Sequence, residues 1–97
     1  FNVYPVDVEN ALSAHPAVYE CSVFGLPDDK WGEAVHAAVQ FHPGAAPDAD
    51  ALKAHVRALL GPVATPKQIH IHDSLPRSPV GKVLKNAVRD AALKETP

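Results

Sequence analysis

The chain has 97 residues, 46% of them hydrophobic, which is enough for one small domain with a modest core. Its net charge of -2 gives no general attraction to nucleic acid or anionic membranes. No apolar run reaches the roughly 20 residues that cross a bilayer. The single cysteine excludes an internal disulfide and favours a cytoplasmic location. Because the sequence contains no methionine, we expect a domain of a longer protein.

The first half of the sequence predicts one helix followed by two strands. A proline opens residues 5–14, and Val8, Ala11 and Leu12 recur there at helical spacing. Residues 17–26 and 33–42 are rich in β-forming side chains and are separated by a loop at 27–32. We expect these two strands to pair as antiparallel neighbours.

The second half predicts a helix, a short strand and a last helix. Asp48 is the expected N-cap of a helix over residues 49–60, and residues 68–72 form the expected strand. The last helix is expected from Lys82 or Val83 to Lys94. The fold class is therefore α+β, a small sheet of about three strands flanked by helices. The apolar faces are expected at Leu52, Val56, Leu59 and Leu60, at Ile69 and Ile71, and at Leu84, Val88, Ala91 and Ala92.

A proline-rich loop ends at Lys82 and carries concentrated positive charge. Pro76 and Pro79 restrict φ, and Gly81 permits a sharp turn. Lys82 would then lie at the start of a helix, where the free N–H groups attract an anion such as phosphate. The alternative is an ordinary solvated basic turn, and these residues alone favour neither. The further cations that we expect to join the site are Arg77, Lys85 and Arg89.

Three segments resemble one family in the same order. Leu-Pro-Arg-Ser-Pro-Val-Gly-Lys-Val-Leu-Lys at residues 75–85 resembles the last core motif of adenylate-forming enzymes. Residues 1–9 resemble the loop after that family's interdomain hinge, and residues 15–33 resemble its middle. The resemblance covers essentially the whole chain and is closest to acyl-CoA synthetases and fatty-acid–CoA ligases.

The resemblance implies that residues 1–97 are the mobile C-terminal lid domain of an ATP-dependent ligase. Such an enzyme converts a carboxylic acid, here a fatty or aryl acid, into an acyl-adenylate and then into a CoA thioester. The large N-terminal domain, absent from these 97 residues, would bind ATP with Mg²⁺ and the acid, so the isolated domain is expected to be inactive. The small domain would change its pose between the two half-reactions.

The resemblance also implies roles for individual residues. Lys82 would be the catalytic lysine, which contacts both the carboxylate and the α-phosphate. Trp31 matches a position near the CoA arm, although a half-buried core tryptophan is an equal alternative. Residues 63–65 lack the aromatic and basic side chains that the family often has there. The supporting residues are Arg77 and Gly81 for the lysine loop, and Asn2, Val3, Tyr4 and Lys67 for the CoA side.

Two other functions stay open on the sequence. The chain could belong to an adenylation domain that docks a carrier protein, or it could be an interaction module without catalysis. A metal site is not expected, because zinc needs three or four ligands and the six histidines are scattered apart from His70 and His72. Cys21 lies within a predicted strand and is interpreted as a buried, inert thiol.

Overall fold

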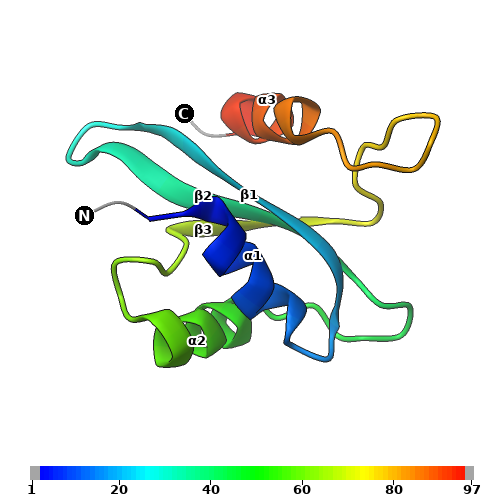
Figure 1. The fold of residues 1–97 in the computed structure, drawn as a ribbon, viewed down its shortest axis with the longest axis horizontal. Helices are drawn as coiled ribbons and strands as arrows, with labels where there is room; N and C mark the ends of the chain where they lie inside the picture. Colours follow the sequence, from blue (N-terminus) through cyan, green and yellow to red (C-terminus); the bar gives the residue numbers. More distant parts are fainter. Residues whose placement is uncertain (1–2, 96–97) are drawn as a thin grey trace.

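A computed structural model describes residues 3–95 of the chain (Figure 1). It confirms the predicted α+β class, with three helices and a three-stranded sheet. None of the helices within residues 3–95 is long and apolar enough to cross a membrane. The elements are α1 (Pro5–Ser13), β1 (Val18–Asp28), β2 (Gly32–Phe41), α2 (Ala49–Leu60), β3 (Gln68–His72) and α3 (Lys85–Glu95).

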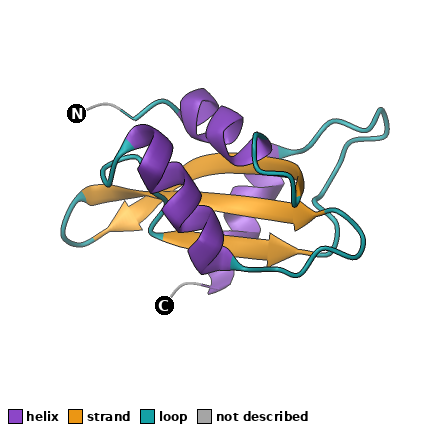
Figure 2. Ribbon diagram, turned by 90° about the horizontal axis from the view of Figure 1, so that it is seen from below, coloured by secondary structure: helices purple, strands orange, loops and turns teal. Residues whose placement is uncertain are grey.

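The sheet has the order β1-β2-β3 and is mixed. β1 and β2 form the expected antiparallel pair, with Val23 opposite Ala37. β3 runs parallel to β2, because the connection between them crosses over through α2. Figure 2 shows α1 and α2 on one face of this sheet and α3 on the other.

Each face of the sheet has its own apolar core. Successive side chains of β1 point to opposite faces, so Val23 packs with α1 and α2 while Phe24 packs with α3. The predicted stripe of α1 is confirmed, since its three apolar residues are buried. The largest buried side chains are Val8, Leu12, Val23, Val39, Leu52 and Val56 on the first face, and Leu26, Leu75 and Val88 on the second.

The apolar faces of α2 and β3 are shorter than predicted. The N-cap of α2 is confirmed, because Asp48 Oδ1 accepts a hydrogen bond from the N–H of Ala51 at 3.0 Å. Leu59 and Leu60, however, are 57% and 41% exposed, because the last turn of α2 extends past the core. Ile71 is likewise 45% exposed, since the first core includes Ile69 but does not reach the end of β3.

The last helix begins at Lys85, so the prediction of a start at Lys82 or Val83 is wrong. Val83 forms a β-bridge with Arg77, and Leu84 donates its N–H to the carbonyl of Pro76 at 2.9 Å. These bonds hold the chain extended, and the first helical bond runs from Val88 N to Leu84 O. The apolar face of α3 is also narrower than predicted. Val88 and Ala92 are buried, whereas Leu84 is exposed and Ala91 is half-buried.

Two histidines are buried between the sheet and α3. Nδ1 of His36 lies 3.0 Å from Nε2 of His70, and Nδ1 of His70 lies 3.2 Å from Oε2 of Glu95. Both imidazoles stack on Phe24. Burial, followed by the proximity of His70, lowers the pKa of His36. Folding therefore favours the neutral form of His36.

This lowered pKa predicts that the domain loses stability in mild acid. The unfolded chain protonates His36 near the usual pKa of about 6.5, while the folded chain resists protonation until a lower pH. The contribution of His36 to the free energy of unfolding should therefore be fully present above about pH 7. It should fall as the pH decreases toward the lowered folded-state pKa. We expect His36→Gln, which replaces the imidazole by an amide that can hydrogen-bond but cannot titrate, to flatten this dependence in thermal unfolding of the 97-residue chain.

The matched control is His42→Gln, since His42 is exposed at the end of β2. This variant should keep the wild-type dependence of melting temperature on pH. A His36→Gln variant with an unchanged pH dependence would contradict the assignment.

Candidate functional site

The lysine loop, residues 75–84, protrudes at one end of the molecule, at the right of Figure 1 in yellow and orange. Ser78 donates its N–H to the carbonyl of Lys82, and Gly81 donates its N–H to the carbonyl of Ser78, both at 2.8 Å. Ser78 Oγ also accepts from the N–H of Lys82 at 3.2 Å. Gly81 has φ of 87°, a conformation that glycine adopts without steric cost. The backbone of Lys82 is therefore fixed although the residue is exposed.

The expected concentration of positive charge around Lys82 is only partly confirmed: Arg77 and Lys85 lie beside Lys82, but both are paired with carboxylates. Arg77 forms an ion pair with Glu20 of β1, and Nζ of Lys85 lies 3.1 Å from Oε2 of Glu9 on α1. Arg89 also points elsewhere, because its Nε donates to the carbonyl of Gly25 at 2.9 Å.

The ammonium of Lys82 has no partner among residues 3–95. Because α3 starts three residues later, the helix N-terminus does not explain its position. The candidate site is therefore one exposed, unneutralised ammonium on a fixed backbone, between two cations that are paired with carboxylates.

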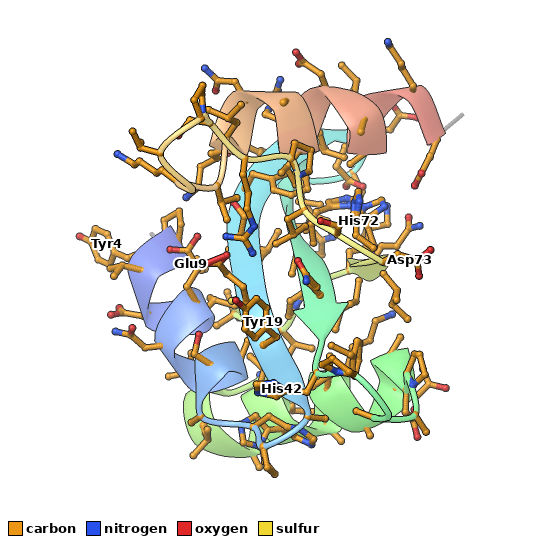
Figure 3. The ribbon with its side chains drawn as sticks, turned by 90° about the vertical axis from the view of Figure 1, so that its right-hand side faces the viewer. Tyr4, Glu9, Tyr19, His42, His72 and Asp73 are labelled. Atoms are coloured by element: carbon orange, nitrogen blue, oxygen red, sulfur yellow. The ribbon has the colours of Figure 1, made fainter. Side chains whose placement is uncertain are left out.

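A hollow of about 530 Å³ lies beside Lys82, between α1 and β1. Figure 3 shows Glu9 of α1 and Tyr19 of β1 below the lysine loop, along this hollow. Cys21 also borders it and is half-buried, with its Sγ 3.6 Å from both the carbonyl of Glu9 and Oγ of Ser13. Burial raises the pKa of the Cys21 thiol, which disfavours the reactive thiolate.

A second group of predicted residues gathers at the opposite end, around the turn between β1 and β2 (Figure 1). Val3, Tyr4 and Trp31 border a hollow of about 460 Å³. Trp31 is 72% exposed, so the alternative of a half-buried core tryptophan is wrong. Asp28 fixes this turn, because its Oδ2 accepts from the N–H groups of Trp31 at 2.9 Å and Lys30 at 3.2 Å.

Lys67 is attached to the same turn through an ion pair with Asp28. A hydrogen bond from Lys67, followed by one from the N–H of Trp31, lowers the pKa of Asp28. Lys67 therefore lies near the Trp31 turn, but a carboxylate offsets its charge.

An apolar hollow of about 230 Å³ lies close to this second group. It is bordered by Tyr4, by Leu60 and by Val63, which is 59% exposed. Asn2, predicted for the CoA side, lies outside the described residues.

The predicted site residues thus form two groups at opposite ends of a molecule whose longest dimension is 35 Å. Sequence reasoning missed Glu9 and Glu20, which pair with the cations on either side of Lys82, and Gln40, whose Oε1 accepts from the N–H of Leu75. Their residue types suggest no such role, because each meets its partner only in the folded chain.

Comparison with known proteins identifies the family. A family model described as the AMP-binding enzyme C-terminal domain matches residues 7–82. The chain belongs to this family. The resemblance seen in the sequence is thereby confirmed, and the match extends from α1 through Lys82.

Relatives of this AMP-binding enzyme C-terminal domain have names that imply different thiol acceptors for the acyl group. This chain is 43% identical to a fatty acid–[acyl-carrier-protein] ligase, ScoC, from Streptomyces coeruleorubidus. The alignment covers 92% of this chain and 17% of that protein. This chain is also 44% identical to a medium/long-chain-fatty-acid–CoA ligase, FadD8, from Mycobacterium tuberculosis. That alignment covers 92% of this chain and 17% of FadD8.

The fold is shared with solved structures of the same kind. The amide bond synthetase McbA from Marinactinospora thermotolerans superposes with a TM-score of 0.87 at 43% identity, over 94% of this chain and 18% of that one. The chain thus spans about a fifth of the length of the relatives that it matches.

Proposed function

We propose that this chain is the C-terminal domain of an AMP-forming acid–thiol ligase, in which Lys82 promotes acyl-adenylate formation. The observation that carries the proposal is the free, exposed ammonium of Lys82 on a hydrogen-bonded loop, within a domain of the AMP-binding enzyme family. The substrate would be a fatty or aryl acid. The partner would be a large N-terminal domain of the same protein.

The chemistry of the first half-reaction explains why an ammonium is needed. A carboxylate oxygen attacks the α-phosphorus of ATP, the bond from that phosphorus to the bridging oxygen breaks, and pyrophosphate leaves. Two anions must meet, and an ammonium with three donors can contact both while negative charge builds up between them. Lys82 would also hold the attacking oxygen in line with phosphorus.

Mg²⁺ and most contacts to ATP are assigned to the large domain. The two carboxylates that flank the lysine loop, those of Glu9 and Glu20, already pair with Lys85 and Arg77. They are therefore poor ligands for a further cation. When bound, Mg²⁺ would neutralise the departing phosphates, whereas Lys82 would act on the α-phosphate and the acid.

The second half-reaction would use the opposite end of the domain. Val3, Tyr4 and Trp31 border an exposed hollow that could receive a pantetheine arm, and Lys67 lies close enough to the Trp31 turn to meet a phosphate of CoA. Since this hollow and Lys82 lie at opposite ends, one pose cannot bring both to the same active site. Two poses of the domain follow from this separation.

A carrier protein is the second candidate for the thiol acceptor. The ScoC relative is named for an acyl-carrier protein. In addition, Asp28 offsets the charge of Lys67. This weakens a grip on the additional phosphates that CoA carries, whereas a carrier-bound phosphopantetheine arm has only one.

The experiment that tests the proposal uses the full-length protein. We expect it to convert ATP and a carboxylic acid from a fatty and aryl panel into AMP and pyrophosphate, and to form a thioester with CoA. Removal of residues 1–97 should abolish ATP–pyrophosphate exchange, and the 97-residue chain alone should be inactive.

Production of ADP, or exchange that persists without residues 1–97, would overturn the proposal. If a thioester forms with a phosphopantetheinylated carrier but not with CoA, the acceptor is a carrier protein and the proposed role of Lys82 stands.

A further inference from the structure

Gln40 contacts the lysine loop at two places. It lies next to the last residue of β2, and its side-chain Oε1 accepts from the N–H of Leu75 at 3.0 Å and from Nη2 of Arg77 at 3.3 Å. Both partners can only donate, so the orientation of the Gln40 amide is determined by its surroundings. One acceptor therefore fixes the start of the loop and the guanidinium of Arg77 together.

The topology of the sheet places Gln40 there. β2 and β3 are parallel and in register, with Gln40 opposite His72, the last residue of β3. Parallel strands end at the same edge of a sheet. The chain that leaves β3 toward the lysine loop therefore starts directly beside Gln40.

Arg77 connects Gln40 to the turn that precedes Lys82. Its Nη1 donates to the carbonyl of Gly81 at 3.2 Å, and its guanidinium lies 5.8 Å from the centre of the Tyr19 ring. It also pairs with Glu20. A planar guanidinium with several fixed acceptors has few alternative rotamers. Gln40 and Glu20 therefore set the direction in which Arg77 reaches Gly81, the residue that precedes Lys82.

We propose that Gln40 is a positioning residue for Lys82, acting through Arg77 and the carbonyl of Gly81. This inference rests on the proposed function. Without the Gln40 oxygen, Arg77 keeps its ion pair with Glu20 but loses the contact that fixes its second nitrogen, and the N–H of Leu75 loses its acceptor. The turn that carries Lys82 would then move, and a displacement of about 1 Å can reduce a catalytic rate by about a hundredfold.

The test compares Gln40→Leu with Gln40→Glu in the full-length enzyme. The leucine has a similar size but no acceptor, whereas the glutamate keeps an acceptor for both donors. We expect Gln40→Leu to slow ATP–pyrophosphate exchange by about ten- to a hundredfold, with little change in KM for ATP. Gln40→Glu should retain most of the exchange rate.

Thioester formation from premade acyl-adenylate should be unchanged in Gln40→Leu, because it depends on the other end of the domain. The matched control is Gln68→Leu, since Gln68 is exposed at the start of β3, away from the loop. It should leave both half-reactions unchanged.

Each outcome separates the inference from the proposed function. If Lys82→Ala abolishes exchange while Gln40→Leu exchanges at the wild-type rate, the positioning role is wrong and the proposed function stands. If Gln40→Leu lowers both half-reactions equally, or Gln40→Glu is as slow as Gln40→Leu, the positioning role is also wrong. If Lys82→Ala leaves exchange intact, the proposed function itself fails.

Discussion

Lys82→Ala in the full-length enzyme is expected to slow acyl-adenylate formation by about a hundred- to a thousandfold, the usual cost of losing one preorganised donor at a developing anion. The substitution removes the ammonium that the described structure leaves unpaired, while the hydrogen bonds that shape the loop use the backbone of Lys82 and survive. The melting temperature should therefore stay nearly constant, since the side chain is exposed. ATP–pyrophosphate exchange measures the loss.

The matched control for this prediction is Trp31→Ala at the opposite end of the domain. Trp31 is exposed, so its loss should also leave stability nearly unchanged. We expect the reverse kinetic result, with pyrophosphate exchange retained and thioester formation from premade acyl-adenylate reduced. If Lys82→Ala lowered both half-reactions to the same extent, the assignment of one end of the domain to each half-reaction would be wrong.

The elements of the fold could be predicted because their signals are local. Pro5 at the start of α1 and Asp48 as the N-cap of α2 each act within a few residues, and the apolar side chains of α1 recur at helical spacing. The start of α3 was mispredicted because residues 82–84 are compatible with a helix. The bridge between Arg77 and Val83 holds them extended, and this tertiary bond outweighs a weak local propensity.

The site could be predicted only in part, for the same reason. Lys82 stands out because prolines, a glycine and a lysine form a local pattern. The acceptors that decide which nearby cation stays free lie far away in the sequence, as with Gln40, which is 35 residues from Leu75. Charge counting along the chain therefore predicted a cluster of cations, whereas folding neutralises Arg77 and Lys85.

Leu75→Ala is expected to cost about 2–4 kcal/mol of unfolding free energy, because it leaves a cavity in the core beneath α3. Leu75 is only 2% exposed and belongs to the cluster that contains Phe24, Leu26 and Val88. Urea unfolding of the 97-residue chain measures the loss. The matched control is Val80→Ala at the tip of the same loop, where the side chain is 90% exposed and the change should stay within about 0.5 kcal/mol.

The same substitution tests whether the lysine loop and the core behave as one unit. If Leu75 anchors the loop against α3, then Leu75→Ala and Val88→Ala remove parts of one packed cluster, and their effects should not add. Additive losses, or a loss for Leu75→Ala no larger than for Val80→Ala, would mean that the loop folds independently of the core. A non-additive result would tie the position of Lys82 to the packing of α3, so that core substitutions far from the ammonium alter the first half-reaction through the loop.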